Sequence, residues 1–207
     1  MAKVTKIERQ KKRENRFSIF IDDRFAVGLS EAEIVSFDIH LGKEISQKEL
    51  RKIKEHSSFE KIKDKALRLI SIRPRSQSEL FEKLSAKKYE EEQIRKVISF
   101  LKKEKLLNDL QFAKQWIYHR TEFGNYGKRR IELELWRKKV PQEIVKKETA
   151  KISPKKEFIR AYEIGLKKWK LLKDDEIQKK REKLIGFLSR KGYSWDIILK
   201  VLEKLKN

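Results

Sequence analysis

The sequence predicts a mainly α-helical protein: three tandem three-helix repeats in an elongated, curved array, preceded by a small N-terminal β-hairpin/α module. Three observations support this fold class. The 207 residues include 7 glycines and 3 prolines, which leaves few turn residues and disfavours an all-β fold. Apolar residues recur at helical spacing along most of the chain after residue 56. Their pattern also repeats at a nearly fixed period, which is typical of tandem repeats.

Residues 1–56 form the predicted N-terminal module. Apolar and polar residues alternate weakly over 3–10 and clearly over 17–21, and Asp22-Asp23 interrupts the alternation before a third run at 24–28. Period-two alternation around short polar turns predicts a β-hairpin or a three-stranded meander. The tip of the hairpin is then the basic segment 11–16, which we interpret as a candidate basic finger.

The remainder of this module is predicted to be helical apart from one brief strand. Ser30 and Glu33 have the spacing of a capping box and predict a short helix over 31–37. The segment 42–45 is expected to return as a short strand, and a further helix is expected over 46–56.

The first repeat, 57–107, contains three predicted helices. Ser57 opens a capping box, so a helix is expected to begin there. Pro74 lacks an amide donor and pushes the residue before it out of the helical region, which ends that helix. Ser76 opens a second capping box and a second helix, and a third helix is expected from about Glu90.

The same pattern recurs twice further along the chain. The segment 84–89 starts with Leu and ends with Tyr, and it has counterparts at 135–140 and 188–193, at offsets of 51 and then 53 residues. Each counterpart is followed by a last apolar helix. These offsets place the three repeats at 57–107, 108–152 and 153–207.

Capping signals mark the starts of the second and third repeats. Asn108 with Gln111 forms a capping pair, and Ser153 stands directly before Pro154. Four tryptophans fall in predicted helices, and packing in the core or between repeats is the favoured interpretation of them, with stacking on nucleic-acid bases as the alternative. They are Trp116, Trp136, Trp169 and Trp195.

Net charge indicates the class of partner. Lysine and arginine number 54 against 32 acidic residues, which leaves a formal charge of +22. A field of this sign attracts polyanions, so nucleic acid is the expected partner. The alternative is that a Lys/Glu-rich chain has well-solvated helix faces and no more than that.

Several function classes are disfavoured. The chain has no cysteine, which excludes disulfides and thiolate metal sites. The histidines are scattered, and the acidic pairs Asp22-Asp23 and Asp174-Asp175 fall in predicted turns, where capping explains them. We therefore expect no enzyme, no metal and no cofactor. No apolar run approaches the roughly 20 residues that a membrane span needs, so a soluble, cytoplasmic protein is expected.

Three runs of residues carry a resemblance to a known family. They are Arg73-x-Arg75-Ser76-x-x-Glu79-Leu80-x-x-Lys83-Leu84, then Leu107-Asn108-Asp109-x-x-Phe112-Ala113-x-x-Trp116, then Gly127-x-x-x-Ile131-x-x-Glu134-Leu135 with Lys139-Val140. These runs resemble the RecX family, whose members regulate the RecA recombinase. The resemblance covers essentially the whole chain, and the N-terminal hairpin resembles an extension found in one branch of the family.

The resemblance implies a partner and an activity. A RecX-like protein is expected to bind along the groove of the RecA–single-stranded DNA filament as a monomer. There it would lower the ATPase and strand-exchange activities of RecA, in recombinational DNA repair and the SOS response. It would also contact single-stranded DNA. The alternative is a nonspecific nucleic-acid-binding protein that neutralises phosphates and has no recombinase partner.

Basic residues at equivalent positions of the three repeats are the candidate contacts. Their spacing predicts a basic stripe along the inside of the array. The expected filament- or DNA-binding residues are Arg73, Arg75, Lys87, Lys88, Lys128, Arg129, Arg130, Arg137, Lys138, Lys139, Arg190 and Lys191.

Overall fold

The computed structural model describes residues 2–10, 15–172 and 176–206, and the chain forms two compact units. The first unit combines Met1–Arg73 with Phe81–Lys103, and the second combines Pro74–Leu80 with Glu104–Asn207. Ten helices and one four-stranded sheet lie within the described residues. The mainly helical fold class with a small N-terminal strand module is therefore confirmed, while the curvature of the array stays a prediction.

The N-terminal sheet is antiparallel, in the order β3-β2-β1-β4. Its strands are β1 (Ala2–Arg9), β2 (Arg16–Ile21), β3 (Arg24–Ser30) and β4 (Glu44–Ile45). The turn between β2 and β3 is Asp22-Asp23, whose φ angles of 47° and 64° suit a tight hairpin turn. Asp22 Oδ1 accepts a hydrogen bond from the Lys3 amide at 2.9 Å. The meander is confirmed, and residues 11–14 of the candidate basic finger lie outside the described residues.

Helix α1 (Glu31–Ser36) follows β3 directly and contacts it, and its first turn has the expected capping box. The Glu33 amide donates to Ser30 Oγ at 3.3 Å, and Glu33 Oε2 accepts from the Ser30 amide at 2.7 Å. The module has its own core of buried side chains, to which Ile53 of α2 contributes. The other members are Val4, Ile19, Ile21, Val27, Leu29, Ile39 and Ile45.

Helix α2 (Gln47–Ile72) is one continuous helix, so the predicted helix start at Ser57 is wrong. No glycine or proline interrupts 47–72, and a local capping pattern cannot open a helix inside an intact hydrogen-bond ladder. Ser57 is fully buried and its Oγ donates to the Gly28 carbonyl oxygen at 2.8 Å. Its hydroxyl therefore anchors α2 to β3. The helix ends at Ile72, and Arg73 is its C-cap directly before Pro74, where the break was expected.

Helix α4 (Glu91–Lys103) packs against α2 within the first unit. The Phe59 and Phe100 rings meet edge to face with centroids 5.7 Å apart, and Ile94, Val97 and Leu101 are buried. Helix α3 (Gln77–Ser85) begins in the second unit and ends in the first.

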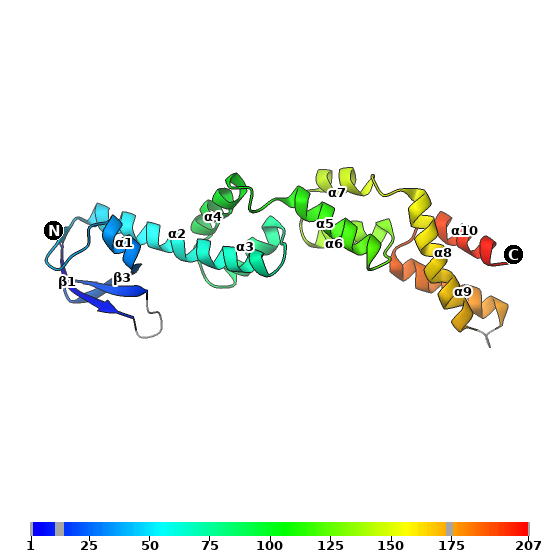
Figure 1. Ribbon diagram of the computed structural model, residues 1–207, viewed down its shortest axis with the longest axis horizontal. Helices are drawn as coiled ribbons and strands as arrows, with labels where there is room; N and C mark the ends of the chain where they lie inside the picture. Colours follow the sequence, from blue (N-terminus) through cyan, green and yellow to red (C-terminus); the bar gives the residue numbers. More distant parts are fainter. Residues whose placement is uncertain (1, 11–14, 173–175, 207) are drawn as a thin grey trace. The chain divides into compact units, whose positions relative to one another are not determined.

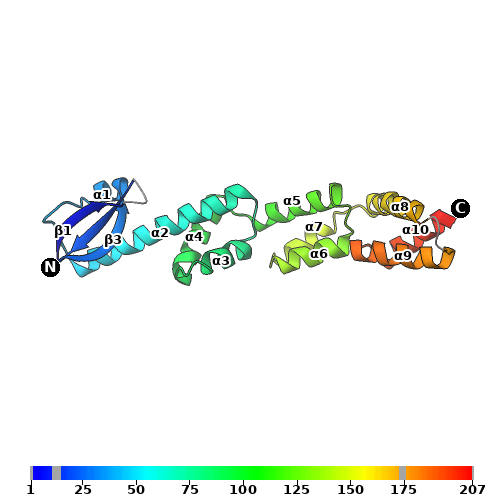
Figure 2. The same cartoon turned by 90° about the horizontal axis from the view of Figure 1, so that it is seen from below.

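The second unit contains two groups of three helices (Figures 1 and 2). Each group has its own core of buried side chains. Helices α5 (Asp109–Glu122), α6 (Lys128–Arg137) and α7 (Gln142–Thr149) surround Phe112, Ile131 and Leu135. Helices α8 (Pro154–Leu171), α9 (Ile177–Lys191) and α10 (Trp195–Lys206) lie side by side around Ala161, Leu184, Leu188 and Tyr193.

Helices α2, α3 and α4 are the first three-helix group in chain order, and the middle helix of every group ends in the same way. Lys88, Lys139 and Gly192 follow α3, α6 and α9, and their φ angles are 60°, 53° and 87°. A left-handed residue after the last turn is a common helix ending that suits glycine and costs other residues free energy. All three middle helices end within the recurring segments 84–89, 135–140 and 188–193.

Candidate nucleic-acid interface

The N-terminus of α6 contacts the C-terminus of α9 directly. The Gly127 amide donates to the Lys191 carbonyl oxygen at 2.9 Å, and the Arg129 amide donates to the Gly192 carbonyl oxygen at 3.2 Å. A Cβ atom on Gly127 would overlap Gly192, and one on Gly192 would overlap Arg130. Backbone therefore lies against backbone, and the glycines are required by close approach.

A buried carboxylate stabilises this junction. Glu157, in the first turn of α8, is 6% exposed, and its Oε1 accepts from the Lys128 amide at 2.8 Å. Such an acceptor satisfies one of the amides that the first turn of a helix leaves without a partner, and the negative charge suits the helix N-terminus.

The same arrangement occurs 48 residues earlier in the chain, also within the second unit. Asp109 is 5% exposed, and its Oδ1 accepts from the Gln77 amide at 2.8 Å. Ser76 Oγ donates to the Lys138 carbonyl oxygen at 2.7 Å. We call the two carboxylates, Asp109 and Glu157, the carboxylate latches, because each joins the first helix of one group to the middle helix of the group before it.

Aromatic rings alternate with cations along the second helix group. Lys138 Nζ lies 4.3 Å from the Trp116 ring centroid, and the Arg120 guanidinium lies 4.4 Å from the same centroid. Arg120 also lies 5.4 Å from the Tyr126 centroid. Arg130 and Lys191 lie 4.4 Å and 4.5 Å from the Tyr126 centroid. These residues, Lys138, Trp116, Arg120, Tyr126, Arg130 and Lys191, form the cation–π ladder.

Glu134 contacts three members of the cation–π ladder. Its side chain is 15% exposed, and it accepts from Trp116 Nε1 at 3.0 Å. Ion pairs join it to Arg120 at 2.7 Å and to Arg130 at 3.2 Å. Lys138 pairs instead with Glu79 at 2.8 Å. Four cations against two carboxylates leave the ladder with a net charge of +2 (4 − 2).

The ladder gives structural roles to several predicted contact residues. Arg130 also donates to the Arg190 carbonyl oxygen at 2.9 Å, and Lys191 donates to the Gly124 carbonyl oxygen at 3.1 Å. Lys128 is half-buried and lies 3.8 Å from Glu132. The predicted contacts of this unit that expose their side chains are Arg129, Arg137, Lys139 and Arg190.

The remaining predicted contacts lie elsewhere in the chain. Arg73, Lys87 and Lys88 are exposed in the first unit, and Arg75 is half-buried at the start of the second. Their membership in one continuous basic stripe stays a prediction. Within the second unit, the bond from Arg130 to the Arg190 backbone brings the cations of α6 near those that end α9.

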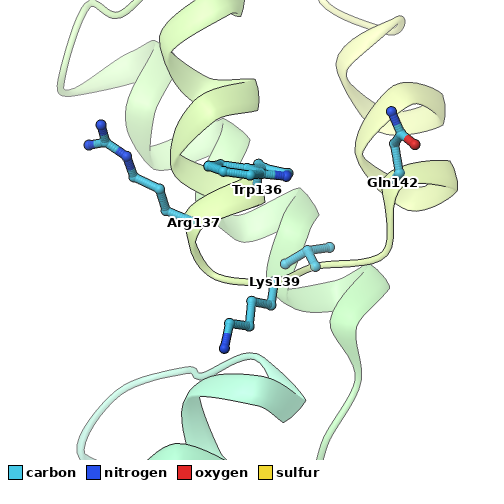
Figure 3. Close-up of a pocket in the computed structure, with 5 residues that line it drawn as sticks. Trp136, Arg137, Lys139 and Gln142 are labelled. Carbon is cyan, nitrogen blue, oxygen red and sulfur yellow. The ribbon is translucent and has the colours of Figure 1, made fainter.

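Sequence reasoning missed the surface around Trp136. Trp136 is 70% exposed and Trp195 is 50% exposed, so the interpretation of all four tryptophans as packing residues is wrong for these two. Trp136 borders a cavity of about 620 Å³ with Arg137, Lys139, Val140 and Gln142 (Figure 3). The signal was present in the helical period, because Ile131 and Leu135 define the buried face of α6, and the next residue lies about 100° away from it.

Residues 2–10, 15–172 and 176–206 were also compared with the requirements of a metal site and of a membrane span. In that part of the chain, no three metal-ligating side chains are grouped, and no helix is long and apolar enough to cross a membrane. Asp22 and Asp23 form the hairpin turn as expected, whereas Asp174 and Asp175 lie outside the described residues.

Comparison with known proteins gives consistent matches along the chain. The family models that match are the regulatory protein RecX N-terminal domain at residues 2–46 and the first, second and third three-helix domains of RecX at 63–101, 108–147 and 156–202. The regulatory protein RecX of Clostridioides difficile (strain 630) is 32% identical over 207 residues, covering 100% of this chain and 97% of the relative. That of Clostridium beijerinckii is 32% identical, covering 99% and 96%.

Solved structures show the same fold. A crystal structure of regulatory protein RecX aligns with a TM-score of 0.75 at 22% identity, covering 98% of this chain and all of the other. RecX from Lactobacillus salivarius aligns with a TM-score of 0.66 at 23% identity, covering 72% of this chain and 97% of the other.

Proposed function

Because the chain belongs to the RecX family of regulatory proteins, we propose that it regulates RecA by binding in the groove of the RecA–single-stranded DNA filament. Binding there inhibits RecA by lowering its ATPase and strand-exchange activities, in recombinational DNA repair. The observation that carries this proposal is the family match along essentially the full chain, from the N-terminal module to the third helix group.

The charge distribution supports a polyanionic filament as the target. The chain carries +22, and the cation–π ladder keeps +2 after its own ion pairs are counted. We infer that the exposed cations Arg129, Arg137, Lys139 and Arg190 contact the filament first, joined by Arg73, Lys87 and Lys88 of the first unit. Arg75, Lys128, Arg130, Lys138 and Lys191 complete the proposed surface while also supporting the fold.

The direct test is the ATPase of preformed RecA filaments on single-stranded DNA, with the full chain titrated in. We expect inhibition at well below one molecule per RecA, and none from a basic DNA-binding protein of similar charge. Inhibition that appears only once the DNA itself is saturated would contradict filament regulation. It would favour the alternative, a nonspecific nucleic-acid binder.

A charge-reversal pair tests the surface. Arg129→Glu with Arg137→Glu removes two exposed cations and leaves the ladder intact, so we expect the concentration for half-maximal inhibition to rise about tenfold, which corresponds to about 1.4 kcal/mol. The matched control is Lys102→Glu with Lys103→Glu, which changes the net charge equally on the exposed end of α4. Equal effects of the two pairs would show that total charge matters and the position does not.

A further inference from the structure

Trp136 presents a large apolar ring to solvent beside positive charge. Its side chain is 70% exposed at the last turn of α6. Figure 3 shows the indole between Arg137 and Gln142, with Lys139 directed away below it. An exposed indole forgoes the hydrophobic stabilisation that burial provides.

The backbone that carries Trp136 is fixed on both sides. Leu135 is fully buried, and Val140 is 5% exposed in the cavity wall. Between them, the Lys138 amide donates to the Glu134 carbonyl oxygen at 3.1 Å, and the Lys139 amide donates to that of Trp136 at 2.8 Å. The turn that carries the chain into α7 is thus fixed, and the indole is presented by a rigid support.

The chemistry around the ring selects one kind of occupant. Among the described residues that line the cavity, two are cationic, one is an amide and none is a carboxylate. A purely apolar partner would cover the charges of Arg137 and Lys139 and remove their water, at a cost. An unpaired base offers a π face for the indole, and the phosphates on either side of it offer counter-charges for the cations.

We propose that Trp136 is a base-stacking platform for single-stranded DNA, with Arg137 and Lys139 on the flanking phosphates and Gln142 beside the base edge. The inference rests on the proposed function in taking single-stranded DNA as the ligand. Bases in a duplex already stack on one another, so this site discriminates against duplex DNA, which must first be unstacked.

Two labelled ligands of equal length separate stacking from charge. The first is a 20-residue oligo(dT), and the second is the same sugar–phosphate backbone without bases, each measured by fluorescence anisotropy with the full chain. We expect Trp136→Ala to weaken oligo(dT) binding by about tenfold, since one stacked base contributes on that order, and to leave the abasic ligand unaffected. Trp136→Phe should recover part of the loss.

The matched control is Trp195→Ala, which removes a 50% exposed indole from α10. We expect it to leave oligo(dT) binding unchanged. An equal loss from both variants, or an equal loss on both ligands, would overturn the assignment, as would an unchanged oligo(dT) affinity in Trp136→Ala. Thermal melting of each variant shows that the fold is retained, and Trp136→Phe keeps the test valid if the alanine variant melts early.

The outcomes also separate this inference from the proposed function. If Trp136→Ala binds oligo(dT) normally and still inhibits the RecA ATPase, the platform is wrong and filament regulation stands. If the wild-type chain fails to inhibit RecA but loses oligo(dT) binding on Trp136→Ala, the platform stands and the filament proposal fails. A loss seen only on RecA filaments would assign Trp136 to a protein contact and overturn the stacking site.

Discussion

At the scale of single residues, Tyr193 links the second and third helix groups through a buried phenol. It is 2% exposed, and its hydroxyl donates to the Asn125 carbonyl oxygen at 2.9 Å. Burial raises the pKa of this phenol to about 12, because the charged form would lose its hydration. The neutral form is therefore the one that the fold stabilises.

A pH prediction follows from this pKa. The phenol of the unfolded chain titrates near its ordinary pKa of about 10. Between that value and about 12 the unfolded state loses its proton while the folded state keeps it, so the free energy of unfolding falls across this window and is highest below it. Phenolate absorbance and urea unfolding at pH 9 to about 12 measure both effects.

The control is Tyr193→Phe. It should cost about 1 kcal/mol at neutral pH through the lost hydrogen bond, and it should remove this share of the alkaline decline. An identical decline in the two proteins would mean that the phenol titrates freely in the folded state.

Two of the predicted contact residues also have roles within the fold that the sequence did not indicate. Arg130 and Lys138 were predicted from charge and spacing alone, as surface cations. In the structure Arg130 pairs with Glu134, and Lys138 pairs with Glu79 while its backbone accepts from Ser76. Charge counts in a sequence do not distinguish a cation that stabilises the fold from one that faces a ligand.

At the scale of elements, each carboxylate latch accepts a hydrogen bond from the first turn of a middle helix. Glu157 satisfies the first amide of α6, as Asp109 satisfies the first amide of α3. The position equivalent to these two in the first repeat is Ile62, which is fully buried in α2. An apolar residue suits that position, because no three-helix group precedes the first repeat.

Glu157→Ala is expected to lower the free energy of unfolding by about 1 to 3 kcal/mol, since the Lys128 amide, in a half-buried residue, is left without its acceptor. Glu157→Gln keeps an acceptor oxygen and should cost less. Urea unfolding measures both changes. Glu163→Ala, at an exposed position of the same helix, is the control and should change stability by about 0.5 kcal/mol or less. A latch variant as stable as the control would show that water replaces the carboxylate without penalty.

Helix starts were the most predictable elements, because their signals are local. Ser30, Ser46, Asn108 and Ser153 all cap helices as their sequences indicate. Ser57 carries the same local signal but does not begin a helix. Its hydroxyl donates instead to the carbonyl oxygen of Gly28, in a strand 29 residues earlier in the chain. Tertiary hydrogen bonds of this kind are absent from a four-residue pattern.

At the scale of the whole molecule, the repeat period predicted the three-helix groups, but the candidate site needed the structure. The ladder joins residues from α5, α6 and the end of α9, and the sequence gives no pairing between them. The sequence places Trp136 outside the buried face of α6, which the apolar period defines. The cavity beside it, however, is lined by residues of the turn into α7, and the sequence did not predict it. The period of the apolar residues predicts which face of each helix is buried. Contacts between side chains that are distant in the sequence depend on how the helices pack against one another.

The salt dependence of binding affinity tests whether the protein recognises the RecA filament or only the phosphates of the DNA. If the four exposed cations Arg129, Arg137, Lys139 and Arg190 each neutralise one phosphate of bare single-stranded DNA, the log–log slope of affinity against salt is about −2.8. Affinity for oligo(dT) should then fall roughly 50-fold between 50 and 200 mM salt by the same relation.

Binding to RecA filaments should fall less steeply, because contacts to protein in the groove release no condensed counterions. Anisotropy of labelled oligo(dT), bare and coated with RecA, measures both slopes under the same buffers. The Arg129→Glu and Arg137→Glu variant should lower the bare-DNA slope by about 1.4, since two phosphate contacts are lost. Equal slopes on bare DNA and filament would mean that phosphate neutralisation accounts for all binding, and the recombinase would then have no part in recognition.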